Sequence, residues 1–276
     1  MEKLDIVDSQ IHLFRTMGIE AALACMDSLG IRSAVIDEFW GFAEDGVSPH
    51  PCIVLPGGLH RAIAPGGQMA SMKHPDRFKY LLRVHHRDPE IAAVIRLSRA
   101  DPHCVALRVD ARTESDVKDF AEHGYRHVFA AATDVGLPVF VLALGNAKLI
   151  EPYLAEFPDC RVVIDHIGMP RTIAEYDDVL HLGGHENAML KWCHAHRTFR
   201  ETYPFPAAIA GLKRAIAAFG ADRILWASDF TAAGSRHHWA DYLYYVRDSG
   251  EISQEDKGWI LSRTARKLLS WPASTI

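Results

Sequence analysis

Short apolar segments rich in β-branched residues recur along the chain, and most are nearly continuous in apolar character. We interpret eight of them as strands, at residues 4–14, 31–37, 78–84, 104–110, 138–144, 161–168, 187–193 and 223–230. Strands that are buried on both faces of a parallel sheet show such continuous runs, whereas a strand with one face in water alternates. The pattern therefore predicts a parallel sheet.

Segments with helical spacing lie between these strands, at residues 18–30, 89–99, 146–158 and 206–220. The last one ends at Gly220, as a helix with a glycine C-cap does. A strand followed by a helix, repeated along the chain, implies right-handed βα units. Eight units in 276 residues favour an α/β fold of the closed (β/α)8 TIM-barrel type, with a single domain over residues 1–276. No GxGxxG follows the first strand to indicate a dinucleotide-binding fold.

Two regions interrupt this alternation. Residues from Trp40 to Met72 contain several prolines and two Gly-Gly pairs, which is typical of a long loop after the second strand. Residues from His194 to Pro206 follow the seventh strand and are rich in aromatic and basic side chains. Loops at that end of a barrel shape the pocket, so we expect both regions to form its walls. A final amphipathic helix is expected between Ser253 and Trp271.

Composition and charge narrow the class of ligand. The formal charge is -5 and no basic run is present, so the sequence predicts neither nucleic-acid nor membrane binding and favours a small-molecule substrate. The five cysteines lack CxxC spacing, which favours reduced thiols in a cytoplasmic protein, as does the absence of a signal-peptide pattern. The oligomeric state is left open, and a homo-oligomer is compatible with the sequence.

Polar side chains gather at the ends of the predicted strands. They are Asp8, Gln10 and His12; Arg83, His85 and His86; Arg108 and Asp110; Asp165 and His166; Lys191, His194 and His196; and Ser228 and Asp229. Because all strands of a parallel barrel end at one mouth, we expect these residues to converge there. Gln10 and His12 are two residues apart, so they should point to the same side of the first strand.

Four of these segments carry a family resemblance. The motifs are DSQIHLF from Asp8, KHPDRF from Lys73, VVIDHIGMP from Val162 and FGADRILWASDF from Phe219. Their types and order resemble the amidohydrolase-related family (amidohydrolase 2 type), a branch of the lactonase-like metal-dependent hydrolase superfamily. Its members include sugar lactonases, pyrone-dicarboxylate lactonases and non-oxidative decarboxylases.

The resemblance implies an HxH pair on the first strand, the DHxG histidine His166 and the terminal aspartate Asp229. This chain departs from the pattern, because Gln10 replaces the first histidine, and Leu142 and Ala143 stand where metal-dependent relatives have another histidine ligand. Of the implied metal ligands only His12 and Asp229 remain, and two protein ligands hold a catalytic zinc ion weakly. We therefore predict no cofactor; a zinc or manganese ion on His12 and Asp229 is the alternative.

A lactone can be hydrolysed without a metal, because an ester needs mainly a general base and a charge stabiliser. In the leading hypothesis Asp229 accepts a proton from water, His12 and His166 polarise the carbonyl or protonate the leaving alkoxide, and Gln10 donates to the oxyanion. The predicted substrate-binding residues are Arg108, Lys191, Arg83, His194, His196 and Trp192. Two alternatives are a non-oxidative decarboxylase and a binding homologue without activity. Arg108 and Lys191 could also form structural ion pairs, and at most one of the adjacent residues His85 and His86 is expected to face the site.

Overall fold

Eight parallel strands form the central sheet of the computed structural model, which describes residues 4–13, 17–38, 52–230 and 237–273. Their spatial order is β1-β2-β5-β6-β7-β8-β9-β10, and a hydrogen bond of 3.1 Å from Asp229 N to Gln10 O joins the last strand end to the first. The strands are β1 (Ile6–Ile11), β2 (Ile31–Asp37), β5 (Phe78–Arg83), β6 (Cys104–Asp110), β7 (Val139–Leu142), β8 (Val162–Ile164), β9 (Ala188–Trp192) and β10 (Ile224–Trp226). The predicted barrel and all eight of its strands are confirmed.

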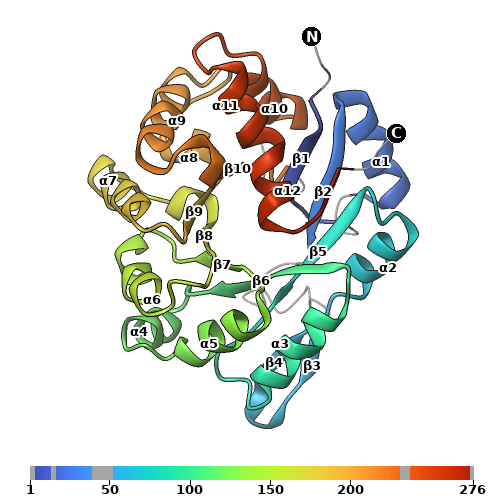
Figure 1. The fold of residues 1–276 in the computed structure, drawn as a ribbon, viewed down its shortest axis with the longest axis vertical. Coiled ribbons are helices and arrows are strands. Elements are labelled where there is room, and N and C mark those ends of the chain that lie inside the picture. The colour runs from blue at the N-terminus through green and yellow to red at the C-terminus, as the bar shows by residue number, and fades with distance from the viewer. Residues whose placement is uncertain (1–3, 14–16, 39–51, 231–236, 274–276) are drawn as a thin grey trace.

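Helices surround these strands and cover their outer faces (Figure 1). They are α1 (Ile19–Leu29), α2 (Pro65–Lys73), α3 (Ile91–Ala100), α4 (Glu114–Ala121), α5 (Arg126–Val135), α6 (Glu151–Glu156), α7 (Ile173–His181), α8 (Ala195–Thr198), α9 (Pro206–Phe219), α10 (Trp239–Arg247), α11 (Gln254–Gly258) and α12 (Thr264–Leu268). Helix α9 ends at Gly220, as predicted. None of the helices in the described part of the chain is long and apolar enough to cross a membrane.

Apolar side chains fill the barrel interior and its lower end. Val7, Val35, Leu81, Phe140 and Leu225 belong to one buried cluster with residues of the C-terminal segment, namely Ala265, Leu269 and Trp271. The C-terminal segment therefore closes the end of the barrel that is opposite to the strand carboxyl ends. It consists of α11, a π-helical turn at Trp259–Arg263 and α12, so the single regular helix predicted there is interrupted.

The segment after β2 is more ordered than the predicted loop from Trp40 to Met72. Residues 40–51 of that loop lie outside the described residues, but β3 (Cys52–Val54) and β4 (His60–Ala62) pair as an antiparallel hairpin. Helix α2 follows, and the Glu38 carboxylate accepts hydrogen bonds from Gly66 N and Gly67 N at its first turn. A carboxylate is stabilised at that end of a helix by the free N–H groups and the dipole.

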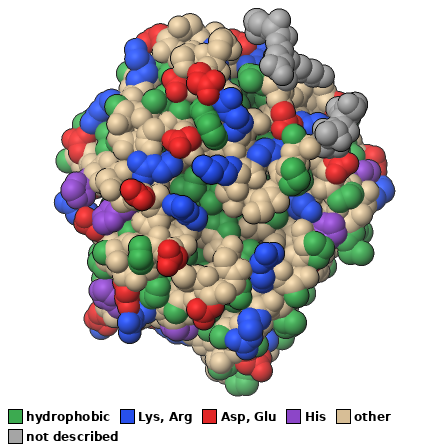
Figure 2. Space-filling view, in the orientation of Figure 1, with side chains coloured by type: hydrophobic (Ala, Val, Ile, Leu, Met, Phe, Trp, Pro, Cys, Tyr) green, Lys and Arg blue, Asp and Glu red, His purple; other side chains and the backbone are tan. Residues whose placement is uncertain are grey.

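Charged side chains of both signs are mixed on the molecular surface. Figure 2 shows Lys and Arg interspersed with Asp and Glu over the face that it presents. This mixture agrees with the formal charge of -5 and with the absence of a basic run in the sequence.

Candidate active site

Three candidate residues follow their strands in a conformation that is rare for residues other than glycine. The backbone φ angles are 49° at His166, 56° at His194 and 47° at Asp229. A left-handed conformation costs a non-glycine residue about 1–2 kcal/mol, and such strain concentrates at functional sites. The sharp turns after β8, β9 and β10 thus bring the three side chains together at the mouth.

The Asp229 carboxylate is the centre of this group. His12 Nε2 lies 2.7 Å from its Oδ1 atom, and His194 Nε2 lies 2.7 Å from its Oδ2 atom. His166 Nε2 is 3.8 Å from Oδ2, and Gln10 Nε2 donates to Oδ1 at 3.3 Å. Burial alone would raise the pKa of Asp229, but the charges and hydrogen bonds of His12 and His194 outweigh it and hold the pKa well below its usual value. Asp229 is therefore a buried carboxylate that stays ionised at neutral pH.

Asp37, at the end of β2, anchors a second group beneath the mouth. Its carboxylate accepts hydrogen bonds from Arg83 Nε at 2.8 Å, from Arg83 Nη2 at 2.6 Å and from Arg108 Nη1. Its backbone oxygen lies 2.6 Å from His12 Nδ1, so it orients the imidazole toward Asp229. Burial opposes ionisation of Asp37, but Arg83 and Arg108 outweigh it and lower the pKa. Sequence reasoning missed Asp37, although it ends an apolar strand as the other site residues do.

Lys191 and Asp165 form a fully buried ion pair next to the group around Asp37. The Lys191 ammonium also donates to Gln10 Oε1, and Arg108 Nη2 contacts Asp165 Oδ2 at 2.5 Å. Arg108 and Lys191 therefore form structural ion pairs in this structure, which was the alternative to their binding substrate. Such pairing is required, because an unpaired charge at this depth would cost several kcal/mol.

His166 lies between Arg108 and the Asp229 carboxylate. Burial and the nearby charge of Lys191 lower the pKa of His166 well below its usual value, so the imidazole is neutral at neutral pH. Its Nε2 atom accepts a hydrogen bond of 3.1 Å from Arg108. The Nδ1 atoms of His166 and of His194 are buried, and no described residue is their hydrogen-bond partner.

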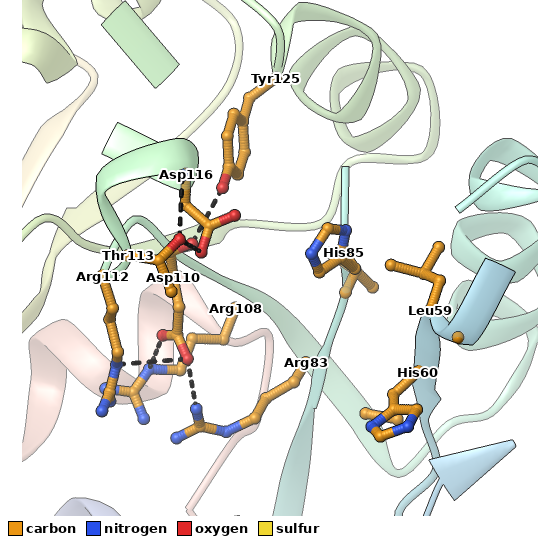
Figure 3. A pocket seen from close by; sticks show the side chains of 13 residues that line it. Leu59, His60, Arg83, His85, Arg108, Asp110, Arg112, Thr113, Asp116 and Tyr125 are labelled. Carbon is orange, nitrogen blue, oxygen red and sulfur yellow. Dashed lines mark hydrogen bonds and ion pairs between the residues drawn. The ribbon is translucent and has the colours of Figure 1, made fainter. Parts of the chain in front are cut away.

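A pocket of about 530 Å³ opens beside this cluster (Figure 3). Its walls include the polar residues Arg83, His85, Arg108, Asp110, Arg112 and Tyr125, together with residues 58–60 and 62 of the hairpin. Three guanidinium groups gather around the Asp110 carboxylate, where Arg83 Nη1 lies 2.5 Å and Arg112 Nε lies 3.6 Å from Oδ2. Burial lowers the pKa of Arg112 to about 10 despite the opposing charge of Asp110, so Arg112 remains a cation at neutral pH.

The structure separates two predicted pocket residues from this group. Trp192 is buried outside the barrel, where its Nε1 atom donates to Tyr245 OH at 2.6 Å. Because Lys191 points inward and successive side chains of a strand alternate, Trp192 has to point outward, which corrects its assignment to the pocket. His196 packs on Tyr242 with ring centroids 5.0 Å apart, and burial lowers its pKa to about 3.

Two other expectations about paired residues can be compared with the structure. His85 and His86 lie beyond the end of β5 with their rings stacked at 4.7 Å. Of the two, His85 lines the pocket and His86 contacts Asp119, which agrees with the expectation that at most one of them faces the site. Gln10 and His12 point to the same side as predicted, since both contact Asp229. Asp8, by contrast, accepts hydrogen bonds from Ser228 N and from Trp239 Nε1 of α10, at 3.0 and 2.8 Å.

The residues around His12 do not fit the metal site that the resemblance implies. Gln10, which replaces the first histidine of the implied pair, offers only an amide whose oxygen already accepts from the Lys191 ammonium. A divalent ion at that oxygen would face this cation at close range. β7 ends with Leu142, followed by Ala143, and neither side chain can ligate a metal. His12 and Asp229 alone therefore make an incomplete ligand set.

A family model described as Amidohydrolase matches residues 68–271. No curated protein matches the sequence significantly. Many solved structures resemble the fold at low sequence identity.

Three of these structures illustrate the range of relatives. A putative 2-pyrone-4,6-dicarboxylic acid hydrolase from Pseudomonas putida is 18% identical with a TM-score of 0.71, and the match covers 97% of this chain and 98% of that one. An amidohydrolase from Burkholderia multivorans with bound zinc is 15% identical with a TM-score of 0.77, over 97% and 99% of the two chains. A 5-carboxyvanillate decarboxylase from Novosphingobium aromaticivorans with manganese is 16% identical with a TM-score of 0.64, over 93% and 81%. At these identities the likeness demonstrates the shared fold.

Proposed function

Since the chain belongs to the amidohydrolase family, we propose that it is a hydrolase that opens a small carboxylated lactone. The observation that carries this proposal is the ionised Asp229 carboxylate, held between His12 and His194 at 2.7 Å on each side. An ionised carboxylate in a water-poor site is a general base whose position is fixed before substrate binds.

In the proposed reaction, water attacks the lactone carbonyl carbon while Asp229 accepts the water proton. Gln10 Nε2, which lies 3.3 Å from Asp229, donates a hydrogen bond to the oxyanion as it develops. The ring C–O bond then breaks, and the proton returns to the leaving alkoxide through His12 or His166. The products are one carboxylic acid and one hydroxyl group in a single open-chain molecule, and the new acid releases its proton to solvent at neutral pH, so atoms and charge balance.

The arginine-lined pocket supports the choice of a carboxylated substrate. Arg108 forms part of the pocket wall and also contacts His166 at 3.1 Å, so the pocket and the Asp229 cluster adjoin. Arg112 lines the same pocket, where its Nε atom lies 3.6 Å from Asp110 Oδ2, and a planar guanidinium group can pair with a carboxylate through two parallel hydrogen bonds. The printed name of the Pseudomonas putida relative refers to a dicarboxylic acid, which agrees with this choice.

The test is acid release from a panel of aldono-lactones and dicarboxylate lactones at neutral pH. Asp229→Asn should lower kcat/KM for the best substrate by about 10²–10⁴, the usual contribution of a general base. The matched control is Asp248→Asn, since Asp248 is an exposed aspartate that pairs with Arg247 on the surface. Equal activity of the Asp229→Asn variant and the wild type would refute the mechanism.

Two other outcomes correspond to the alternative functions. Release of carbon dioxide from an aromatic carboxylic acid, without lactone opening, would identify a decarboxylase, as the Novosphingobium aromaticivorans relative is named. Stoichiometric binding of a lactone without turnover would identify a binding homologue. Either result would overturn the proposed hydrolysis.

A further inference from the structure

Four potential metal ligands from the ends of three neighbouring strands, Asp229 among them, lie close together at the barrel mouth. His166 follows β8, Cys193 and His194 follow β9, and Asp229 follows β10. One ligand atom from each of the four lies within 4.8 Å of one atom of every other. Imidazole, thiolate and carboxylate are the donors that zinc takes in proteins, and four of them complete a tetrahedral shell.

The arrangement of the two imidazoles suits a shared ion. The rings of His166 and His194 are tilted by 48° with centroids 4.7 Å apart, so their planes are far from parallel and intersect. A nitrogen lone pair lies in the plane of its ring, and two rings can ligate one ion only near such an intersection. Each ring also has a buried Nδ1 atom with no described hydrogen-bond partner, and both side chains are more than nine-tenths buried.

A second group of similar composition lacks this property. His85, His86 and Asp116 also approach one another within 4.8 Å. The rings of His85 and His86 are nearly parallel, with an angle of 16° between their planes, so their lone pairs cannot converge on one ion without rotation of a ring. The orientation of the imidazole rings therefore favours the group around Asp229 as the metal site.

We propose that His166, Cys193, His194 and Asp229 bind one divalent ion of the zinc class. The site shares Asp229 with the incomplete pair formed with His12, but its remaining ligands come from the ends of the sixth and seventh barrel strands. Arg108, which donates to His166 Nε2 in this structure, keeps its partners Asp37 and Asp165 when that nitrogen turns to an ion. Four protein ligands fill a tetrahedral shell, as in structural zinc sites, so an ion held there would fix the ends of three strands relative to one another.

Cobalt(II) is the direct probe, because a thiolate ligand gives it a charge-transfer absorption band in the near ultraviolet. Titration of the purified, chelator-treated full chain with Co²⁺ should saturate at one equivalent and develop this band, and Zn²⁺ should displace the cobalt. Cys193→Ser should abolish the band and weaken Co²⁺ binding at least tenfold. The matched control is Cys160→Ser, since Cys160 is equally buried but lies outside the group.

Two further variants distinguish the proposed ligand set from a site on His12 and Asp229. His194→Gln should weaken Co²⁺ binding at least tenfold, whereas His12→Gln should leave the charge-transfer band in place. Loss of binding in His12→Gln with an unchanged Cys193→Ser variant would overturn the proposal in favour of a site on His12 and Asp229. No retained cobalt or zinc in the wild type would also overturn it. Because these readouts need no substrate, the proposed lactone hydrolysis stands or falls separately.

Discussion

The buried pair of Lys191 and Asp165 provides the strictest test of the energetics of the site. Both side chains are fully buried, and the ammonium also donates to Gln10 Oε1. At an effective dielectric constant of about 20, two unit charges about 4 Å apart attract each other by about 4 kcal/mol. Removing Asp165 leaves the Lys191 ammonium as an uncompensated buried charge, which costs about 3–5 kcal/mol, whereas removing Lys191 leaves Asp165 paired with Arg108.

We therefore expect Asp165→Asn to lower the free energy of unfolding by about 3–5 kcal/mol, and Lys191→Met to lower it by less. The double variant should lose little more than Asp165→Asn alone, because it leaves no unpaired ammonium group. The resulting coupling energy is about 1–3 kcal/mol. Urea unfolding, followed by tryptophan fluorescence and far-ultraviolet circular dichroism, measures these differences where the two probes coincide.

The chain contains a matched exposed pair as the control. Lys213 Nζ lies 3.0 Å from Glu251 Oε2, and the two side chains are 52% and 60% exposed. A double-mutant cycle on this pair should give a coupling energy of about 0.2–1 kcal/mol. If the coupling energy of the buried pair is no larger than that of Lys213 and Glu251, burial does not make the charges of this site depend on one another.

Three further predictions test other parts of the molecule. Burial raises the pKa of Asp8 to about 6, so its protonated form favours folding. Relative to Asp8→Asn, the wild type should lose about 2.4 kcal/mol of unfolding free energy between pH 4 and 7 in urea titrations. A methyl group on Gly183 would lie 2.5 Å from Ala218 O, so Gly183→Ala should lower stability by about 1–3 kcal/mol in thermal unfolding, and Gly184→Ala, which meets nothing within 4 Å, should not. If the proposed function holds, Arg112→Gln should raise KM for carboxylated lactones about tenfold and leave neutral lactones unaffected in steady-state assays.

The barrel could be predicted well because each of its strands leaves a pattern in a short, continuous stretch of sequence. Each buried strand is an apolar run, and the order of strands and helices restricts the topology strongly. The hairpin formed by β3 and β4 was missed because each strand has three residues, too few to show a period, among prolines and glycines. The interrupted C-terminal helix was missed because the apolar periodicity continues through the π-helical turn.

The site was predictable where strand periodicity decides the direction of a side chain. Gln10 and His12 follow that rule, and applying it to Lys191 would have excluded its neighbour Trp192 from the pocket. Asp37 shows the same signal, an acidic residue at the end of an apolar strand, and could have been found by treating every strand end alike. The position of Cys193 beside Asp229 could not be predicted, because it depends on tight turns after separate strands.

The left-handed backbone at His166, His194 and Asp229 also bears on how the protein can be engineered. Glycine adopts this conformation without steric cost, so glycine at any of the three positions relieves about 1–2 kcal/mol of backbone strain, while it deletes the side chain that the mouth requires. Selection for thermal tolerance alone would therefore favour substitutions that remove function here, and a screen for hardier variants needs an activity or ligand-binding readout to retain these residues.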